Sequence, residues 1–289
     1  MTSPTATTTP TANASATARG IRASTTRKTA FAALRGIGSA LAAFALVLAL
    51  WWLALVVLNI PPFVGKTPLD VWAFLFTVPA AEENRAFVGA MLGETMVDSS
   101  LGFVAGLSAA FALAGLFLLF RGVEQTLMPI ALLLQSVPLI AIAPIIILIF
   151  GRDVVTTAVM GGLVVLFPAL VTLVFGLRSA TPQMLDLITV FGGGSLATLQ
   201  KVSIPSALPA LFAAIRISIP GAITGAMIAE WLATGRGMGY AIVAAVGASQ
   251  MSLVWTLAVV ITAVSLLLYM GVGIVERTTL TRFGMAREL

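Results

Sequence analysis

The sequence contains no cysteine and no histidine among its 289 residues. Disulfide bonds, thiol chemistry, metal sites built from Cys or His, and His-dependent catalytic triads are therefore excluded. Charge is also scarce, since Asp, Glu, Lys and Arg make up 9% of the chain, against roughly 25% in soluble domains. Apolar residues account for 59% of the sequence, and the mean hydropathy is +1.07. This composition predicts an integral membrane protein.

The N-terminal segment differs in composition from the rest of the chain. It is rich in Thr, Ala and Ser, and the first acidic residue of the chain is Asp70. Because it has few large apolar side chains to bury, we expect residues 1–35 to form a disordered cytoplasmic tail before a membrane domain at 36–289. An acid-poor organellar presequence is the alternative. A cleaved secretory signal fits less well, since the first apolar run is longer than a signal core.

Six apolar runs are long enough to cross a bilayer, for which a helix needs roughly 20 residues. Runs of this length predict helices, and neighbouring helices or water can satisfy the carbonyls that internal prolines free. The predicted fold class is therefore all-α, a polytopic membrane protein with six transmembrane helices. The runs are 37–58, 95–119, 127–150, 154–176, 208–232 and 253–275.

Positive charge predicts the orientation of these spans. With six spans both termini lie on one side, which carries eleven of the sixteen Lys and Arg residues, and the opposite side carries four. The remaining one, Arg216, falls inside the fifth run. By the positive-inside rule, both termini are expected in the cytoplasm. The net charge of +5 thus follows topology rather than a nucleic-acid-binding face.

The loop between the fourth and fifth spans is expected in the cytoplasm and contains the sequence DLITVFGGGSLATLQKVSIPSALP. Apolar residues at helical spacing predict two short helices separated by three glycines that begin at Gly192. Pro205 is expected to end the second helix, and Asp186 to lie near a helix N-terminus, where a carboxylate is favoured. Two interpretations are open: an amphipathic loop on lipid headgroups, with Lys201 facing phosphates, or a docking element for a cytoplasmic partner.

This loop resembles the EAA loop of bacterial ABC importer permeases, whose pattern is Glu-Ala-Ala, three residues, Gly, nine residues, Ile-x-Leu-Pro. With Gly192 as the glycine, the acid falls on Asp186 and the final proline on Pro205. The chain departs from the pattern in having Asp for Glu and Leu-Ile for Ala-Ala. The resemblance implies an ATPase-coupling loop formed by Asp186, Leu187, Ile188, Gly192, Gly193, Val202, Ile204 and Pro205.

The flanking segments extend the resemblance to the nitrate/sulfonate/taurine/bicarbonate branch of these permeases. They are NIPPFVGKTPLDVW, SVPLIAIAPIIILIFG, LFPALVTLVFGL and AEWLATGRGMGYAI. The resemblance implies a type I importer fold in the bacterial cell membrane. Two permease copies, or two related permeases, are expected to sit on an ATP-binding cassette ATPase dimer and to receive solute from an extracytoplasmic solute-binding protein.

The resemblance also sets expectations for cofactor and solute. No cofactor is expected in this chain, because ATP and Mg would be bound by the partner ATPase. The solute implied first is a small organic or inorganic anion of the sulfonate, taurine or nitrate type. The alternative is a thiamine pyrimidine precursor, another heterocycle or an aromatic acid.

Polar side chains inside the spans predict the translocation pathway or a gate, because each is costly unless it faces water or a partner. The candidates are Glu230, Gln135 and Asp98. Interfacial exposure is the alternative for Glu230 and Asp98, as snorkelling to the headgroups is for Arg216. Glu230 is preferred, because the resemblance places an acid in Ala-Glu before the glycine turn.

Other classes of protein have weaker support. An intramembrane enzyme would have to use Asp98 and Glu230 as a dyad without any supporting motif. A channel would need a ring of charges or a carbonyl filter, and the sequence has neither. Val64-Gly65-Lys66-Thr67 resembles the end of a phosphate-binding loop, but the required earlier glycine is replaced by Ile60.

Three sets of glycines remain. Gly102 and Gly106, and likewise Gly221 and Gly225, have the small-xxx-small spacing of closely packed membrane helices. We expect packing within one bundle in preference to a dimer interface. The glycines at 235, 237 and 239 have the wrong spacing for a dinucleotide fingerprint and predict an extracytoplasmic turn.

Overall fold

The computed structural model describes residues 38–39 and 42–283, so the predicted tail, residues 1–35, lies outside the described residues. The chain divides into two units, Met1–Pro68 and Leu69–Leu289. In the described part of the first unit, the apolar helix Ala42–Val57 leads into a turn. A Cβ on Gly65 would lie 2.7 Å from the Leu55 side chain, and Lys66 Nζ donates to the Pro62 carbonyl at 2.7 Å. This turn is closely packed, and although α2 begins directly after it at Pro68, Ile60 stands where a phosphate-binding loop needs glycine.

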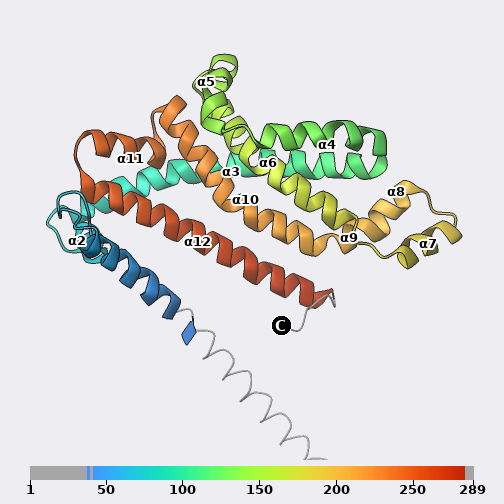
Figure 1. Ribbon diagram of the computed structural model, residues 1–289, viewed down its shortest axis with the longest axis horizontal. Helices are drawn as coiled ribbons and strands as arrows, with labels where there is room; N and C mark the ends of the chain where they lie inside the picture. The colour runs from blue at the N-terminus through green and yellow to red at the C-terminus, as the bar shows by residue number, and fades with distance from the viewer. Residues whose placement is uncertain (1–37, 40–41, 284–289) are drawn as a thin grey trace, which may run out of the picture. The chain divides into compact units, whose positions relative to one another are not determined.

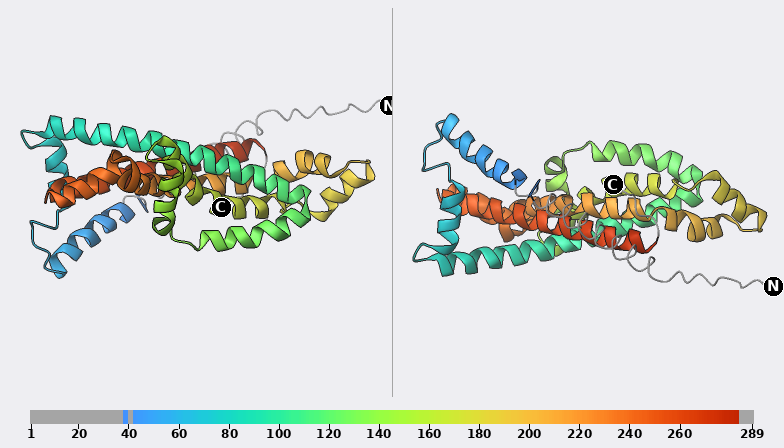
Figure 2. Two further views of the ribbon diagram at one scale, coloured as in Figure 1. Left: turned by 90° about the horizontal axis from the view of Figure 1, so that it is seen from above. Right: turned by 90° about the horizontal axis from the view of Figure 1, so that it is seen from below.

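The second unit is built from helices, and Figures 1 and 2 show them from three directions. α2 starts at the boundary between the units, and two π-helical segments, η1 and η2, interrupt the later helices. The elements are α2 (Pro68–Phe76), α3 (Ala81–Leu119), α4 (Arg121–Gln135), α5 (Leu139–Phe150), α6 (Val154–Leu177), α7 (Pro182–Val190), α8 (Ser195–Thr198), η1 (Leu199–Ser203), α9 (Ile204–Ser206), α10 (Leu208–Ala229), η2 (Glu230–Thr234), α11 (Gly237–Gly247) and α12 (Met251–Arg282).

Four helices in the described residues are long and apolar enough to cross a membrane: α3, α6, α10 continued through η2, and α12. They correspond to the second, fourth, fifth and sixth predicted runs. The third run, predicted as one helix, is instead broken into α4 and α5, which meet at an angle of 106°. The helix Ala42–Val57 is shorter than a span. The count of six spans therefore stays a prediction.

The centre of the second unit is a junction at which three helices approach through glycine. A Cβ on Gly102 of α3 would lie 2.8 Å from the Gly161 Cα of α6, and one on Gly225 of α10 would lie 2.7 Å from the same atom. We call Gly102, Gly106, Gly161, Gly162, Gly221 and Gly225 the glycine junction. Backbone packs directly on backbone at Gly102, Gly161 and Gly225, while Gly106 and Gly221 also face the side chains of Val165 and Val164. Small residues let membrane helices approach in this way. Both glycine pairs thus pack within one bundle, as predicted.

The same contacts give the direction of each helix. Gly102 and Gly106 meet Gly161 and Val165 in the same order, so α3 and α6 run parallel. In contrast, α10 runs antiparallel to α6, because Gly225 lies beside Gly161 at one end and Ala210 beside Gly176 at the other. If α3 and α6 both span the membrane, their parallel directions require the bent α4–α5 pair between them to cross it once.

The bend between α4 and α5 occurs at one of three prolines in this region. Pro129 and Pro144 lie inside helices, whereas Pro138 is the N-cap of α5, with φ −60° and ψ 126°. The chain leaves α4 at Ser136, whose hydroxyl donates to the Leu133 carbonyl at 2.7 Å. Proline disfavours helical geometry in the residue before it, which explains why a break is permitted here.

Buried apolar side chains fill the space on both sides of the glycine junction. Towards the C-terminal end of α3 they include Phe117, Leu170 and Leu173. Towards the N-terminal end of α3 they include Val88, Met238 and Leu257, which join α3, α11 and α12. The bundle therefore has a packed core at each end of the long helices.

Candidate functional site

The segment from α7 to α9, Pro182–Ser206, projects from one end of the second unit, and α11 lies at the other end (Figures 1 and 2). We call this segment the arm. It contains all eight residues of the predicted coupling loop. α7 packs on α8, while η1 and α9 pack on the end of α6. The arm therefore has two parts. Its base, η1 and α9, contacts α6, and its tip, α7 and α8, projects beyond the spans.

Gly192 forms the bend between the two parts of the arm. Its φ of +76° is in the left-handed region, which glycine reaches without steric cost. Nothing lies within 4 Å of a Cβ built there, so the requirement is one of backbone conformation alone. A Cβ on the next residue, Gly193, would lie 2.5 Å from the Ile188 side chain. The predicted helix–glycine–helix arrangement is therefore present.

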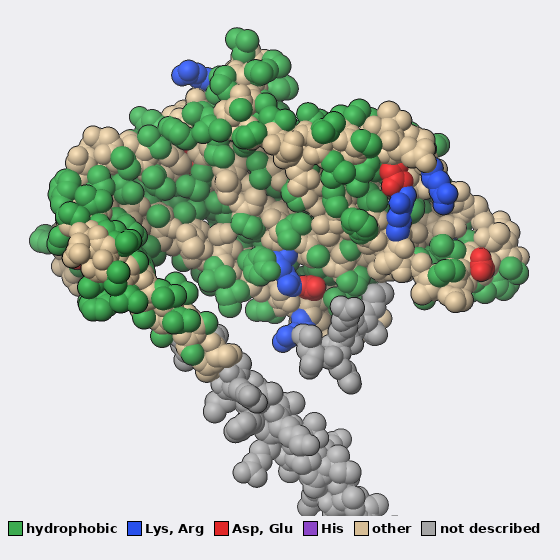
Figure 3. All heavy atoms as spheres, viewed as in Figure 1, with side chains coloured by type: hydrophobic (Ala, Val, Ile, Leu, Met, Phe, Trp, Pro, Cys, Tyr) green, Lys and Arg blue, Asp and Glu red, His purple; other side chains and the backbone are tan. Residues whose placement is uncertain are grey.

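The arm tip exposes large apolar side chains although it lies outside the membrane-spanning helices. Val190 and Phe191 are each 81% exposed, and Leu187 and Leu196 are more than half exposed. On the face shown in Figure 3, charged side chains gather around the arm end of the unit and the C-terminal half of α12. Contiguous apolar exposure beside charged groups marks interaction surfaces.

The base of the arm is held firmly to the spans. A Cβ on Gly176 of α6 would lie 2.1 Å from the Ala210 Cβ of α10, so these two helices touch where the arm begins and ends. The Ser179 hydroxyl bonds to the Gly176 carbonyl at 2.7 Å and approaches the Ser206 carbonyl at 3.3 Å. Arg178 forms an ion pair with Glu124 of α4. These contacts therefore join the base of the arm to α6 and α10 together.

Two local predictions for the arm were wrong. Asp186 is the fifth residue of α7, which starts at Pro182, so it lies beyond the first turn and gains little from the free amides there. Pro205 does not end the second short helix, because α9 continues through it to Ser206. The π-helical turn η1 directly precedes α9, and the Ile204 amide before the proline bonds to the Leu199 carbonyl.

At the opposite end of the unit, Glu230 is fully buried and binds the start of α11. Its Oε2 accepts a hydrogen bond from the Gly239 amide at 2.7 Å. Two residues of α3 complete the set, since Glu94 accepts from the Gly237 amide and the Thr95 hydroxyl from the Met238 amide, each at 2.8 Å. The free amides that begin a helix are thus satisfied by side chains from two other elements.

We call Glu94, Thr95, Asp98 and Glu230 the Glu230 cluster. It depends on glycine, because a Cβ on Gly237 would lie 2.3 Å from the Glu230 Cδ, and one on Gly239 would lie 2.1 Å from the Met227 carbonyl oxygen. Gly235 and Gly237 both have positive φ. The glycines therefore form the predicted turn and also admit the carboxylate. The sequence interpretation missed Glu94 and Thr95, which stand 143 residues from their partners.

Asp98 belongs to this cluster but makes fewer contacts. It is 3% exposed, and its Oδ2 has no hydrogen-bond partner within the described part of the chain. Glu94 and Asp98 are four residues apart on α3 and therefore share a face. The described residues contain no group of three carboxylates arranged to hold a metal ion. Glu230 is bonded to a helix and closed to water, which is unsuited to a catalytic dyad.

Gln135 lies away from the Glu230 cluster. It is exposed at the end of α4 and lines a pocket of about 450 Å³ inside the α4–α5 bend, with Pro138, Phe167 and Pro168. Arg216, for which snorkelling was considered, pairs instead with Glu276 of α12 and stacks on Tyr269, whose ring centroid is 5.3 Å away.

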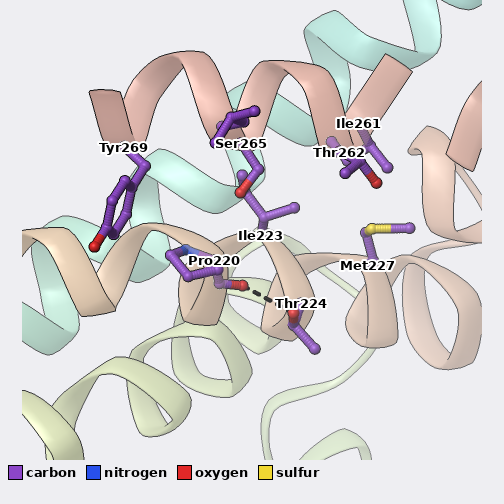
Figure 4. A pocket seen from close by; sticks show the side chains of 9 residues that line it. Pro220, Ile223, Thr224, Met227, Ile261, Thr262, Ser265 and Tyr269 are labelled. Atoms are coloured by element: carbon purple, nitrogen blue, oxygen red, sulfur yellow. Dashed lines mark hydrogen bonds between the residues drawn. The ribbon is translucent and has the colours of Figure 1, made fainter. Parts of the chain in front are cut away.

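A second pocket of about 510 Å³ lies between α10 and α12 (Figure 4). Tyr269 and Pro220 lie at one end and Met227 at the other. The hydroxyls of Thr224 and Thr262 donate to carbonyls of their own helices, at 2.8 Å and 2.7 Å. No charged residue lines either of the two pockets.

Comparisons with known proteins agree with this architecture. The model of the family described as "Binding-protein-dependent transport system inner membrane component" matches residues 102–280. A probable ABC transporter permease protein of Haemophilus influenzae is 31% identical, over 78% of this chain and 90% of its own length. The formylaminopyrimidine transport permease protein ThiX of Halalkalibacterium halodurans is 30% identical, over 52% of this chain and 60% of its own. The putative aliphatic sulfonates transport permease protein SsuC of Bacillus subtilis is 29% identical, over 68% and 66%.

The family match spans more than half of the residues and includes the glycine junction, the arm and Glu230, whereas Glu94, Thr95 and Asp98 precede it. The chain therefore belongs to the binding-protein-dependent transport system inner membrane components, the permeases of type I ABC importers. It is a transporter subunit rather than an enzyme, and it is a membrane protein. The family implies an ATPase and a solute-binding protein as partners.

Proposed function

We propose that this chain imports a small organic solute as the membrane-spanning subunit of a complex that contains two copies of it. Each arm docks on one subunit of an ATPase dimer in the cytoplasm, and ATP and Mg are bound there. A solute-binding protein delivers the solute to the α11 end. The observation that carries the proposal is the arm tip, which exposes Val190 and Phe191 outside the spans although exposed apolar surface is costly in water.

Transport follows from how the arm is attached. When the ATPase dimer closes on ATP, the two arms are drawn together. Because Gly176 contacts Ala210 and Ser179 approaches the Ser206 carbonyl, each arm moves α6 and α10 together. The helices then alternate between two arrangements around a central path that Gln135 lines, as in alternating access. This chain performs no covalent chemistry on the solute.

The docking step is tested with Val190→Asp and Phe191→Asp, in the complex reconstituted with its ATPase and binding protein. We expect both variants to lose co-purification with the ATPase and stimulation by loaded binding protein, while their thermal stability is unchanged. Gln183→Asp is the matched control, because Gln183 is an exposed polar residue on the same helix. If the apolar variants keep their ATPase, the arm lies on lipid and the docking assignment is wrong.

Two solute classes have specific support. A sulfonate-type anion is supported by the aliphatic sulfonates permease among the relatives. An uncharged heterocycle is supported by the formylaminopyrimidine permease and by the two pockets, which have no charged lining residue. Recognition of an anion uses Arg, Lys or converging N–H donors, so the pocket chemistry favours the heterocycle. Uptake of labelled alkanesulfonate and labelled aminopyrimidine into proteoliposomes, with the matching binding protein, distinguishes the two.

A further inference from the structure

The Glu230 cluster contains a buried carboxylate with an unused oxygen, and the turn beside it carries an exposed cation. Asp98 is 3% exposed and its Oδ2 is unbonded, whereas Arg236 is exposed and forms no ion pair with any described residue. A buried charge without a partner is costly, and structures usually pair or neutralise it. An ion pair between Arg236 and Asp98 would remove this cost if the two side chains can meet.

The backbone places these two residues close together. Arg236 directly precedes Gly237, whose amide bonds to Glu94 at 2.8 Å, and Asp98 lies one helical turn beyond Glu94 on the same face of α3. Arg236 and Glu94 both lie close enough to Asp98 to act on it electrostatically. Glu230 faces the same space from η2. Within the described residues, Arg236 is thus the cation available to three carboxylates.

The turn that carries Arg236 has a glycine on each side of the arginine. Arg236 is extended, at φ −143°, between Gly235 at φ +69° and Gly237 at φ +78°. Glycine moves between left-handed and right-handed regions at little steric cost, so rotation at these two positions swings the intervening residue. The five residues before Gly235, which form η2, are π-helical, and this geometry is frequent at functional sites.

We propose that Asp98 and Arg236 form a switched ion pair that latches α11 during the transport cycle. In the arrangement described, the α11 amides are held by Glu94, Thr95 and Glu230, and the latch is open. In the alternate arrangement the turn pivots and the guanidinium of Arg236 meets Asp98 Oδ2, so that this ion pair replaces the amide bonds as the polar contact between α11 and α3. Asp98 is then a positioning residue that acts on the gate and does not touch the solute. This inference rests on the proposed import function.

A double-mutant cycle tests the pair in the reconstituted complex. Asp98→Asn and Arg236→Gln are each expected to lower solute uptake about tenfold, within the range of ordinary coupling energies. The double variant should be no worse than either single variant, and Arg236→Lys should restore part of the uptake. Asp98→Asn should leave the melting temperature equal or higher, because it removes a buried, unbonded charge.

Ser218→Ala is the matched control, since Ser218 is also buried with an unbonded hydroxyl but lies on α10 away from the cluster. It should transport normally. Additive losses in the cycle, or normal uptake by Asp98→Asn, would overturn the latch. If the unmodified complex itself moves no solute with its binding protein and ATPase, then the proposed import function has failed instead.

Thiol labelling supplies a direct measure of movement, because the natural chain has no cysteine. Tyr240→Cys places a single thiol on α11, where the native side chain is 44% exposed. Its labelling rate should differ between nucleotide-free and vanadate-trapped complexes. In the Asp98→Asn background that difference should disappear. An unchanged difference in this background would show that α11 moves without the ion pair.

Discussion

At the α11 end of the second unit, the first three amides of α11 each bond to a side chain, and Glu230 is fully buried. At the arm end, α7 packs on α8, and Val190 and Phe191 are 81% exposed. The α11 end is closed by contacts within the chain, whereas the arm tip leaves apolar surface uncovered. This difference is the one expected if a partner covers the arm tip and the α11 end forms a gate, as proposed above.

The largest expected effect concerns the side of the membrane on which each end of the second unit lies. A reporter that is active only in the cytoplasm should work when it is inserted at Gly193 in the arm, and it should be silent at Glu83, which is exposed near the start of α3. The result is all-or-none, because α3 and α6 run parallel and their N-terminal ends share one side. Equal activity at both sites would contradict the predicted orientation.

The next effect concerns packing at the α11 end. Gly237→Ala places a Cβ 2.3 Å from the Glu230 Cδ at a φ of +78°, so we expect a loss of stability well above the about 1–2 kcal/mol of left-handed strain alone. Gly235→Ala is the matched control, since its φ is +69° but nothing lies within 4 Å. Thermal unfolding in detergent should give a lower melting temperature for Gly237→Ala than for Gly235→Ala. Equal melting temperatures would refute close packing around Glu230.

A contrasting effect is expected at the arm. Gly192→Val forces a β-branched residue to φ +76°, which disturbs the bend, while the open space around it spares the rest of the bundle. We expect weakened association with the ATPase and an unchanged melting temperature. Gly194→Val is the control, because Gly194 has φ −87° and equally open surroundings. Normal coupling in Gly192→Val would mean that the bend angle is irrelevant.

The smallest effect is at the arm base. Ser179→Ala removes one good hydrogen bond at 2.7 Å and one weak contact at 3.3 Å. The expected destabilisation is about 0.5–1.5 kcal/mol, typical of a single hydrogen bond. A slight drop in melting temperature should accompany a modest loss of ATPase stimulation. Stimulation that is lost completely would show that the contact with the Ser206 carbonyl matters far more than its length suggests.

The sequence was informative where a pattern is local. Gly192 was identified as a bend from its position between two amphipathic stretches, and the two glycine pairs from their spacing. Their common partner on α6, Gly161–Gly162, was not identified, because adjacent glycines have no spacing signal in a helix. Glu230 was singled out, but its partners are distant in sequence, and nothing local marks Glu94 or Thr95 as helix caps.

Helix boundaries were harder to predict for a different reason. Hydropathy locates only the apolar part of a helix, so α3 was predicted from 95 although it begins at Ala81. Its first residues carry charge and still form a helix. Pro129, Pro138 and Pro144 were all expected to be tolerated within one span, but the chain bends at Pro138. Which proline breaks a helix depends on the packing around it, and that information is not local.

The glycine junction has a mechanical consequence. Gly161 lies about 7 residues from the start of α6 and about 16 from its end, or roughly 10 Å and roughly 24 Å at the rise of a helix. If α6 rotates as a rigid body about the contact at Gly161, its two ends lie at unequal distances from the pivot. A displacement imposed at Leu177 reaches Val154 at less than half its size but with more than twice the force. Under the proposed coupling, the off-centre junction therefore converts a large displacement at the arm end of α6 into a smaller and more forceful one at Val154.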